Sequence, residues 1–252
     1  MTCALARLRD GESVYGMLQI LPEAAITELA VWCGYDFVLL DCEHGVLDEA
    51  QQLESLRTVA ASDAFSLVRL RSRDESAITR YIEFGADGVI VPDVNTSAQA
   101  ERLVLAVARS RTGLSRAERY GLGIDHGPAT TPLLLVMMES AESIEQVESI
   151  LDVRGIDGAI VGPRDLSRNL GIPNDFTAPA YVAALDRVEA AARSRSRLLG
   201  SRPNPACPAS ALIERGYRLI IIAADIALVR TALASELRSQ KSSAHAEVHL
   251  SR

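Results

Sequence analysis

Short apolar runs alternate eight times with longer amphipathic segments along this chain of 252 residues. The apolar runs have the composition of buried strands, and the amphipathic segments have helical spacing. Because a helix between two such strands returns the chain to the same end of a sheet, this repeat predicts a parallel sheet. The predicted strands are residues 14–20, 37–40, 66–70, 88–91, 133–138, 158–161, 198–200 and 219–223.

Eight strand–helix units in about 250 residues are typical of a closed (β/α)8 TIM barrel. The sequence therefore predicts an α/β fold with one barrel domain over residues 1–240, followed by a flexible polar tail over 241–252. The alternative is an open doubly wound sheet, but no glycine-rich phosphate loop follows the first strand. The predicted helices are 23–33, 48–61, 75–84, 97–110, 143–150, 165–169 with 178–195, 209–216 and 227–239.

Cap and loop residues agree with these boundaries. Ser97 and Ser143 stand at predicted N-caps, where a hydroxyl accepts a hydrogen bond from a free backbone N–H. Segments 111–131 and 201–208 are rich in residues that interrupt helices and are predicted to be loops. Glycines that end a helix in a left-handed conformation are expected at Gly34, Gly85, Gly155 and Gly216.

Composition excludes several classes of protein. The net charge is −7, and no basic stripe points to nucleic-acid binding. No apolar run reaches the ~18 residues of a membrane-spanning helix, and no signal-peptide pattern opens the chain. A cytoplasmic protein without a membrane partner is predicted. Its cysteines lack zinc-site spacing and are expected to be reduced: Cys3, Cys33, Cys42 and Cys207.

Polar residues directly after the strands are expected to converge, because the carboxyl ends of parallel strands meet at one face of a barrel. Active sites of such barrels are built at this face. The candidates are Asp41, Glu43 and His44 after the second strand, Arg69 after the third, Glu139 after the fifth, and Gly162, Pro163, Arg164 and Asp165 after the sixth.

Glu139 and Asp165 are the predicted metal ligands. Adjacent parallel strands lie about 4.8 Å apart, so carboxylates at the ends of the fifth and sixth strands can reach one ion. Two carboxylates that leave positions open for water and substrate suit Mg²⁺ or Mn²⁺. The alternatives are an N-cap for Asp165 and a surface carboxylate for Glu139.

Arg69 and His44 are candidates for charge stabilisation and proton transfer. The planar donor fork of Arg69 suits a carboxylate or another oxyanion, although a salt bridge to Asp41 or Glu43 is an alternative or additional role. His44 could act as a general base or be purely structural. Cys42 as a nucleophile is a further alternative, which a site with a metal pair does not require.

The turn at Gly162-Pro163 leads into the predicted helix that contains Asp165. Free backbone N–H groups at such a helix start suit a substrate carboxylate. A plain strand-to-helix turn is the alternative.

Five segments together resemble the class II, metal-dependent pyruvate aldolases of the 2,4-dihydroxyhept-2-ene-1,7-dioate aldolase family. Relatives of that family include 2-dehydro-3-deoxyglucarate aldolase, macrophomate synthase, a siderophore-pathway citrate synthase and the citrate lyase beta-like proteins. The resemblance extends from about residue 16 to about residue 225. The segments are DCEHG (41–45), VR (68–69), GADGVIVP (85–92), ES (139–140) and GIDGAIVGPRDLS (155–167).

The resemblance implies a (β/α)8 barrel that assembles as a hexamer, a trimer of dimers that exchange their last helix. It implies a divalent ion, Mg²⁺ or Mn²⁺ with Co²⁺ as an alternative, held by Glu139 and Asp165. Arg69 is implied to stabilise a pyruvate enolate, and His44 to act as general base with Asp41 nearby. Glu83 stands where the family has an aspartate that supports this histidine.

The implied reaction is reversible cleavage of a 4-hydroxy-2-oxo acid to pyruvate and an aldehyde. The alternatives are a condensing enzyme that joins acetyl-CoA to oxaloacetate through the same enolate chemistry, and a barrel without catalytic activity. The chain departs from the family pattern at Met137, where a glutamine is usual, and at Arg164, where a small residue is frequent. Arg116, Arg119 and Arg164 would suit a multiply charged partner.

Overall fold

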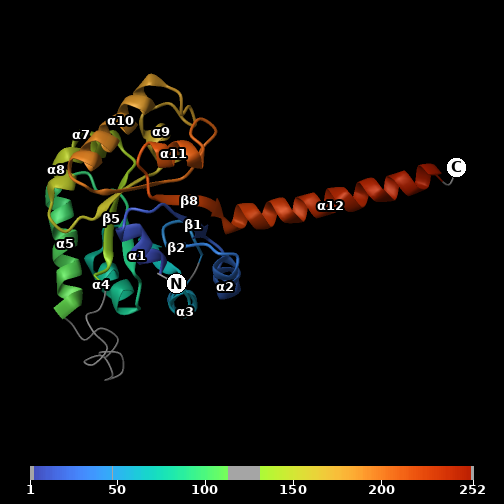
Figure 1. Ribbon diagram of the computed structural model, residues 1–252, viewed down its shortest axis with the longest axis horizontal. Helices are drawn as coiled ribbons and strands as arrows, with labels where there is room; N and C mark the ends of the chain where they lie inside the picture. Colours follow the sequence, from blue (N-terminus) through green and yellow to red (C-terminus); the bar gives the residue numbers. More distant parts are fainter. Residues whose placement is uncertain (1–2, 47, 113–130, 251–252) are drawn as a thin grey trace.

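The computed structural model describes residues 3–46, 48–112 and 131–250. Within them, parallel strands close into a barrel in chain order, with β8 paired to β1 (Figure 1). The predicted (β/α)8 fold is confirmed. The strands are β1 (Val14–Gln19), β2 (Phe37–Asp41), β3 (Phe65–Arg69), β4 (Gly88–Val91), β5 (Leu133–Met138), β6 (Gly158–Val161), β7 (Leu198–Ser201) and β8 (Leu219–Ala224).

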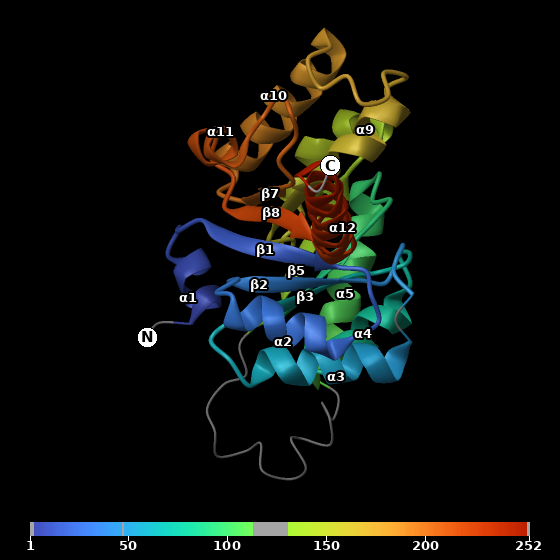
Figure 2. The same ribbon diagram turned by 90° about the vertical axis from the view of Figure 1, so that its right-hand side faces the viewer.

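Helices surround this barrel on most of its circumference (Figure 2). They are α1 (Ala4–Arg9), α2 (Ala24–Trp32), α3 (Glu49–Ala60), α4 (Glu75–Glu83), α5 (Ser97–Thr112), α7 (Ala141–Glu145), α8 (Val147–Asp152), α9 (Pro163–Asn169), α10 (Pro179–Ser194), α11 (Ala209–Glu214) and α12 (Asp225–Leu250).

Side-chain alternation along each strand divides the core into two layers. Successive residues of a strand point to opposite faces, so every second residue enters the barrel. Phe37, Leu39 and Leu67 belong to the interior cluster, whereas Val38 and Val68 pack beneath the helices. The same parity directs the last residues of these strands inward at the carboxyl end of the barrel.

The short helix α1 was not expected from the sequence. Its buried face, with Leu5 and Leu8, joins the interior cluster that contains Phe37 and Phe65. Six residues are too short for a clear helical period, which explains why the pattern did not reveal it.

Two predicted N-caps are wrong by one or more residues. The α7 helix is capped by Ser140, whose side chain accepts from the backbone N–H of Ser143 while the Ser143 hydroxyl closes the capping box. The α5 helix begins at Ser97, but Thr96 Oγ1 accepts the hydrogen bond from Gln99 N at 3.3 Å. Both helices thus start nearer the strand end than their predicted caps.

The last helix, α12, leaves the barrel and projects from it as a single arm (Figures 1 and 2). It begins at Asp225, whose carboxylate accepts hydrogen bonds from Ile20 N and Leu21 N beyond β1. The predicted helix end at residue 239 is wrong, because α12 continues to Leu250. The domain limit at residue 240 therefore does not coincide with a helix end, and the flexibility of 241–252 stays a prediction.

Across the described ranges, no helix combines the length and apolarity that crossing a bilayer requires.

Candidate active site

Asp41 and Arg69 form the buried ion pair at the base of the site. They are register partners at the carboxyl ends of β2 and β3. Arg69 donates from Nε to Asp41 Oδ1 at 3.0 Å and from Nη2 to Oδ2 at 2.7 Å, and its Nη1 lies 3.2 Å from Glu43 Oε2. Burial opposes the charge of Arg69, but the hydrogen bonds and ion pairs with both carboxylates outweigh it and raise the pKa of this guanidinium.

The same Asp41 carboxylate holds the turn that carries His44. Its Oδ1 accepts from the backbone N–H groups of Glu43 and His44, both at 3.1 Å. Asp41 thus contacts the backbone of His44, and it is fully buried. The imidazole itself is 63% exposed, and its Nε2 lies 3.9 Å from Glu43 Oε2. His44 thus remains accessible to a substrate. The alternative considered for Arg69, a salt bridge to Asp41 or Glu43, is present with both carboxylates.

Glu139 lies directly after β5, at the position that interior parity directs into the barrel. It is half-buried, and its Oε1 accepts from Asp93 N at 2.9 Å. Burial, reinforced by the charges of Glu43, Asp93 and Asp165, raises the pKa of Glu139 to about 7. A plain surface carboxylate, the alternative considered from the sequence, does not describe this environment.

Asp165 lies in the first turn of α9, where the N-cap is Gly162 and Pro163 occupies the next position. The alternative that Asp165 caps this helix is therefore wrong. Its Oδ1 forms an ion pair with Arg168 Nη1 at 3.4 Å. A Cβ added to Gly162 would lie 3.1 Å from Met137 Cε and 3.5 Å from Glu139 Oε2. The absence of a side chain at Gly162 thus lets the start of α9 approach Glu139 closely.

The acidic residues suit a divalent cation. Glu139 and Asp165 line one cavity of about 440 Å³ together with Glu43 and His44. Glu43 Oε2 is buried and accepts no hydrogen bond from the described residues, although it lies 3.2 Å from Arg69 Nη1 as an ion-pair partner. Among the described residues, no group of three or more His, Cys, Asp and Glu is arranged to hold a metal. Two carboxylates with the remaining positions open are the ligand set that Mg²⁺ accepts.

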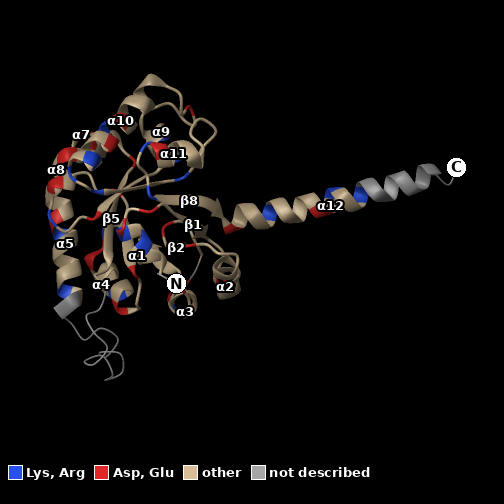
Figure 3. Cartoon of the chain, in the orientation of Figure 1, with Lys and Arg blue, Asp and Glu red and all other residues tan. Residues whose placement is uncertain are grey.

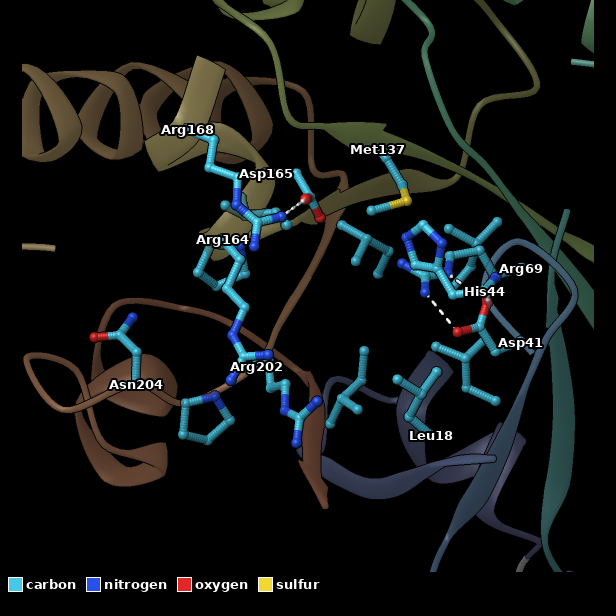
Figure 4. A pocket seen from close by; sticks show the side chains of 18 of the residues that line it. Leu18, Asp41, His44, Arg69, Met137, Arg164, Asp165, Arg168, Arg202 and Asn204 are labelled. Carbon is cyan, nitrogen blue, oxygen red and sulfur yellow. Dashed lines mark hydrogen bonds and ion pairs between the residues drawn. The ribbon is translucent and has the colours of Figure 1, made fainter. Parts of the chain in front are cut away.

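A second cavity of about 550 Å³ adjoins the acidic one and extends across the mouth of the barrel (Figure 4). Asp41, His44 and Arg69 lie on one side of it, and Arg164 and Arg202 lie on the other. Arg202 was missed by the sequence analysis. It directly follows β7, so the rule that selected Arg69 after the third strand would have found it.

Other candidates lie elsewhere. Glu83 ends α4 before the chain enters β4, whereas His44 follows the carboxyl end of β2, so one chain does not bring them together. Burial raises the pKa of the Cys42 thiol to about 11, which leaves it protonated and a poor nucleophile near neutral pH. Arg116 and Arg119 lie outside the described residues.

A family model described as HpcH/HpaI aldolase/citrate lyase matches residues 15–232. The chain belongs to this family. The hydroxypyruvate/pyruvate aldolase of Sagittula stellata is 32% identical over 241 residues, which are 90% of this chain and 93% of the relative. The pyruvate aldolase of Rhizobium etli is 31% identical over 88% of this chain and 91% of its own length.

A solved structure of an HpcH/HpaI aldolase/citrate lyase family protein from Burkholderia cenocepacia superposes with a TM-score of 0.84 at 28% identity. The match covers 94% of this chain and 98% of that one. The resemblance inferred from five sequence segments is thus confirmed, and the chain is an aldolase, a carbon–carbon lyase. Dependence on a divalent metal is a general character of the family.

Proposed function

We propose that this HpcH/HpaI family member cleaves a 4-hydroxy-2-oxo acid reversibly to pyruvate and an aldehyde. The observation that carries the proposal is the convergence of Glu139, Asp165, Arg69 and His44 on adjoining cavities at the carboxyl face of the barrel. Relatives about 30% identical over most of the chain are named pyruvate or hydroxypyruvate aldolases, which supports the 2-oxo acid as substrate class.

Glu139 and Asp165 are proposed to hold the divalent ion. When bound, the ion supplies Lewis-acid stabilisation for the negative charge that develops on the 2-oxo acid. The ion is proposed to be Mg²⁺ or Mn²⁺, with Co²⁺ as the alternative, because both side-chain ligands are carboxylates.

Arg69 is proposed to stabilise the enolate oxygen of pyruvate. Its guanidinium is fixed on one side by Asp41 and Glu43, and it lines the larger cavity on the other. A donor that is already oriented does not need to reorganise as charge develops, which makes such stabilisation effective.

His44 is proposed as the general base that removes the 4-hydroxyl proton during cleavage and returns it during condensation. Asp41 acts on this histidine by holding the backbone turn. A role for Glu83 would require that a second chain brings its α4 to the site, and this stays a prediction. The backbone N–H groups of Arg164 and Asp165, exposed by Gly162 and Pro163, are proposed to bind the substrate carboxylate.

The decisive experiment measures pyruvate release from a series of 4-hydroxy-2-oxo acids, alongside condensation of acetyl-CoA with oxaloacetate. We expect cleavage with added Mg²⁺ or Mn²⁺ and its loss after chelation, with activity restored by the metal. Condensation of acetyl-CoA without any cleavage would replace the aldolase proposal by the citrate-synthase-like alternative. If the protein catalyses neither reaction and binds no metal, this result would favour a barrel without catalytic activity.

The protruding helix supports a homo-oligomer. Apolar side chains on α12 are exposed, among them Leu228, Leu233 and Leu237, and they alternate with acidic and basic residues along its described part (Figure 3). Ile222 on β8 is also 44% exposed, because α12 does not fold back over this strand. We propose that two chains exchange α12 to cover these surfaces and that three such dimers form a hexamer.

Light scattering with size-exclusion chromatography tests this assembly. Leu233→Glu combined with Leu237→Glu should produce monomers, whereas Arg230→Gln on the same helix should leave the oligomer unchanged. A monomeric wild-type protein would contradict the proposal. The cytoplasmic location stays a prediction.

A further inference from the structure

Arg164 and Arg202 line the side of the larger cavity that lies across from Arg69 in Figure 4. Arg202 directly follows β7, and Arg164 belongs to the first turn of α9. Their side chains lie side by side in the close-up view (Figure 4). Within the described ranges, the guanidinium of neither residue makes a hydrogen bond or an ion pair.

This arrangement differs from that of Arg69, whose charge is neutralised by Asp41 and Glu43. Burial together with the nearby charges of Arg164 and Arg69 lowers the pKa of Arg202. A partly buried cation beside another cation is unfavourable unless an anion completes the site. This side of the cavity thus has the features of an anion-binding site, and no carboxylate of the described residues occupies it.

The cavity wall next to Arg202 contains two prolines, so the guanidinium groups are the hydrogen-bond donors available to an anion there. Pro203 and Pro205 line the cavity there and have no backbone N–H to donate. Asn204 Oδ1 accepts from the backbone N–H groups of Ala206 and Cys207, both at 3.0 Å, which fixes this segment after β7. The strand end and the braced turn together hold Arg202 at the cavity.

We propose that Arg202, together with Arg164, determines acceptor specificity by binding an oxyanion at the end of the aldehyde remote from its carbonyl group. The proposal rests on the aldolase function above. A guanidinium pair can bind a carboxylate or a phosphate through parallel charge-assisted hydrogen bonds. The cavity volume of about 550 Å³ lies within the ~300–1,000 Å³ that holds a complete small ligand, which leaves room beyond pyruvate.

The test compares matched pairs of acceptors in condensation with pyruvate. Succinic semialdehyde is compared with butanal, which replaces its carboxylate by a methyl group, and glyceraldehyde 3-phosphate is compared with glyceraldehyde. For each pair, the ratio of kcat/KM for the anionic acceptor to that for the neutral one is measured in wild type, Arg202→Gln, Arg202→Lys and Arg164→Gln. The pair whose ratio changes identifies a carboxylate or a phosphate as the bound group.

We expect wild type to prefer an anionic acceptor and Arg202→Gln to lower that ratio about 10- to 100-fold, mainly through KM, as expected for the loss of a charge-assisted hydrogen bond. Arg202→Lys should give a ratio between those of Arg202→Gln and wild type. Arg164→Gln should lower the ratio less than Arg202→Gln does. The control is Arg154→Gln, which makes the same charge change at an exposed residue before β6 and should leave the ratio unchanged.

A wild-type enzyme without preference for either anion, or an Arg202→Gln ratio equal to that of wild type, overturns the subsite. An equal loss with anionic and neutral acceptors also overturns it, because that result indicates a general structural role. Failure of the wild type to cleave or condense any 2-oxo acid overturns the aldolase proposal itself, and the subsite with it.

Discussion

The two sides of the barrel mouth differ in the sign of the charge that they leave without a partner. On the acidic side, Glu139 accepts a backbone hydrogen bond, and burial, reinforced by the charges of neighbouring carboxylates, raises its pKa to about 7. On the arginine side, Arg164 and Arg202 have no carboxylate partner within the described residues. Between them, Asp41 and Arg69 neutralise each other.

The difference indicates that the acidic side and the arginine side bind ligands of opposite charge. A fold that maximised its own stability would pair the carboxylates of one side with the arginines of the other, since unpaired buried charge is costly. Keeping the two signs apart suits a ligand set that also carries both signs, namely a divalent cation and an anionic substrate. The largest effects of substitution should therefore fall on the acidic side and on the central ion pair.

Removing a carboxylate from the acidic side should have the largest effect. Glu139→Gln keeps the size of the side chain but removes the charge that would hold the ion, so turnover should fall by about 10³-fold or more. Binding of Mn²⁺, measured by electron paramagnetic resonance or calorimetry, should weaken in parallel. Glu142→Gln, an exposed residue of α7, is the matched control. Unchanged Mn²⁺ binding in Glu139→Gln would refute the assignment of this ligand.

Replacing the central cation should have the next largest effect. Arg69→Lys retains the positive charge but cannot reproduce the two hydrogen bonds to Asp41 and the approach to Glu43. We expect kcat to fall about 100-fold, while Mn²⁺ affinity changes much less. Thermal unfolding should show whether the protein remains folded. A normal kcat would show that the oriented guanidinium does not stabilise the enolate.

Adding a methyl group at Gly162, where α9 packs closely against the end of β5, should have a moderate effect on kcat/KM. The Cβ of Gly162→Ala would press on Met137 Cε and approach Glu139 Oε2. Because the end of the methionine can move, we expect stability to change little, but a displaced Glu139 should lower kcat/KM about tenfold. Gly171→Ala is the control for a glycine-to-alanine substitution, because its added Cβ would meet no atom within 4 Å. Its positive φ adds backbone strain, which should affect stability rather than Glu139. An unaltered kcat/KM would show that close packing here is not required.

Breaking the contact between Arg168 and Asp165 should have the smallest effect. This pair is 3.4 Å apart, and its side chains are 64% and 42% exposed, so the ion pair is well solvated. An exposed pair of this kind contributes about 0–1 kcal/mol. Arg168→Gln should therefore change Mn²⁺ affinity by less than about fivefold, as measured by calorimetry. A much larger loss of affinity would show that Arg168 positions Asp165.

The candidate site residues could be selected from the sequence because the end of an apolar strand is a local feature of the chain. The apolar runs located each strand end, and the rule that these ends meet at one face of a barrel selected Asp41, Arg69 and Glu139. The inward direction of these positions comes from the alternation seen in the structure. The helix boundaries were less accurate at the caps, where Ser140 and Thr96 rather than the predicted serines accept the bonds. A cap depends on which backbone N–H groups remain free, and a short sequence pattern does not specify this.

The sequence by itself determined that this chain forms an eight-stranded barrel with acidic and basic residues at the carboxyl ends of its strands. The repeated alternation of apolar runs and amphipathic segments is sufficient for that conclusion. Only the tertiary structure decided which of these charges are paired. The pairing of β2 with β3 joins Asp41 to Arg69. Arg202 lies near Arg164, and neither has a carboxylate partner among the residues that the structure describes. The departure of α12 from the barrel was likewise decided by packing, because an amphipathic helix does not encode in its own pattern which surface it will cover.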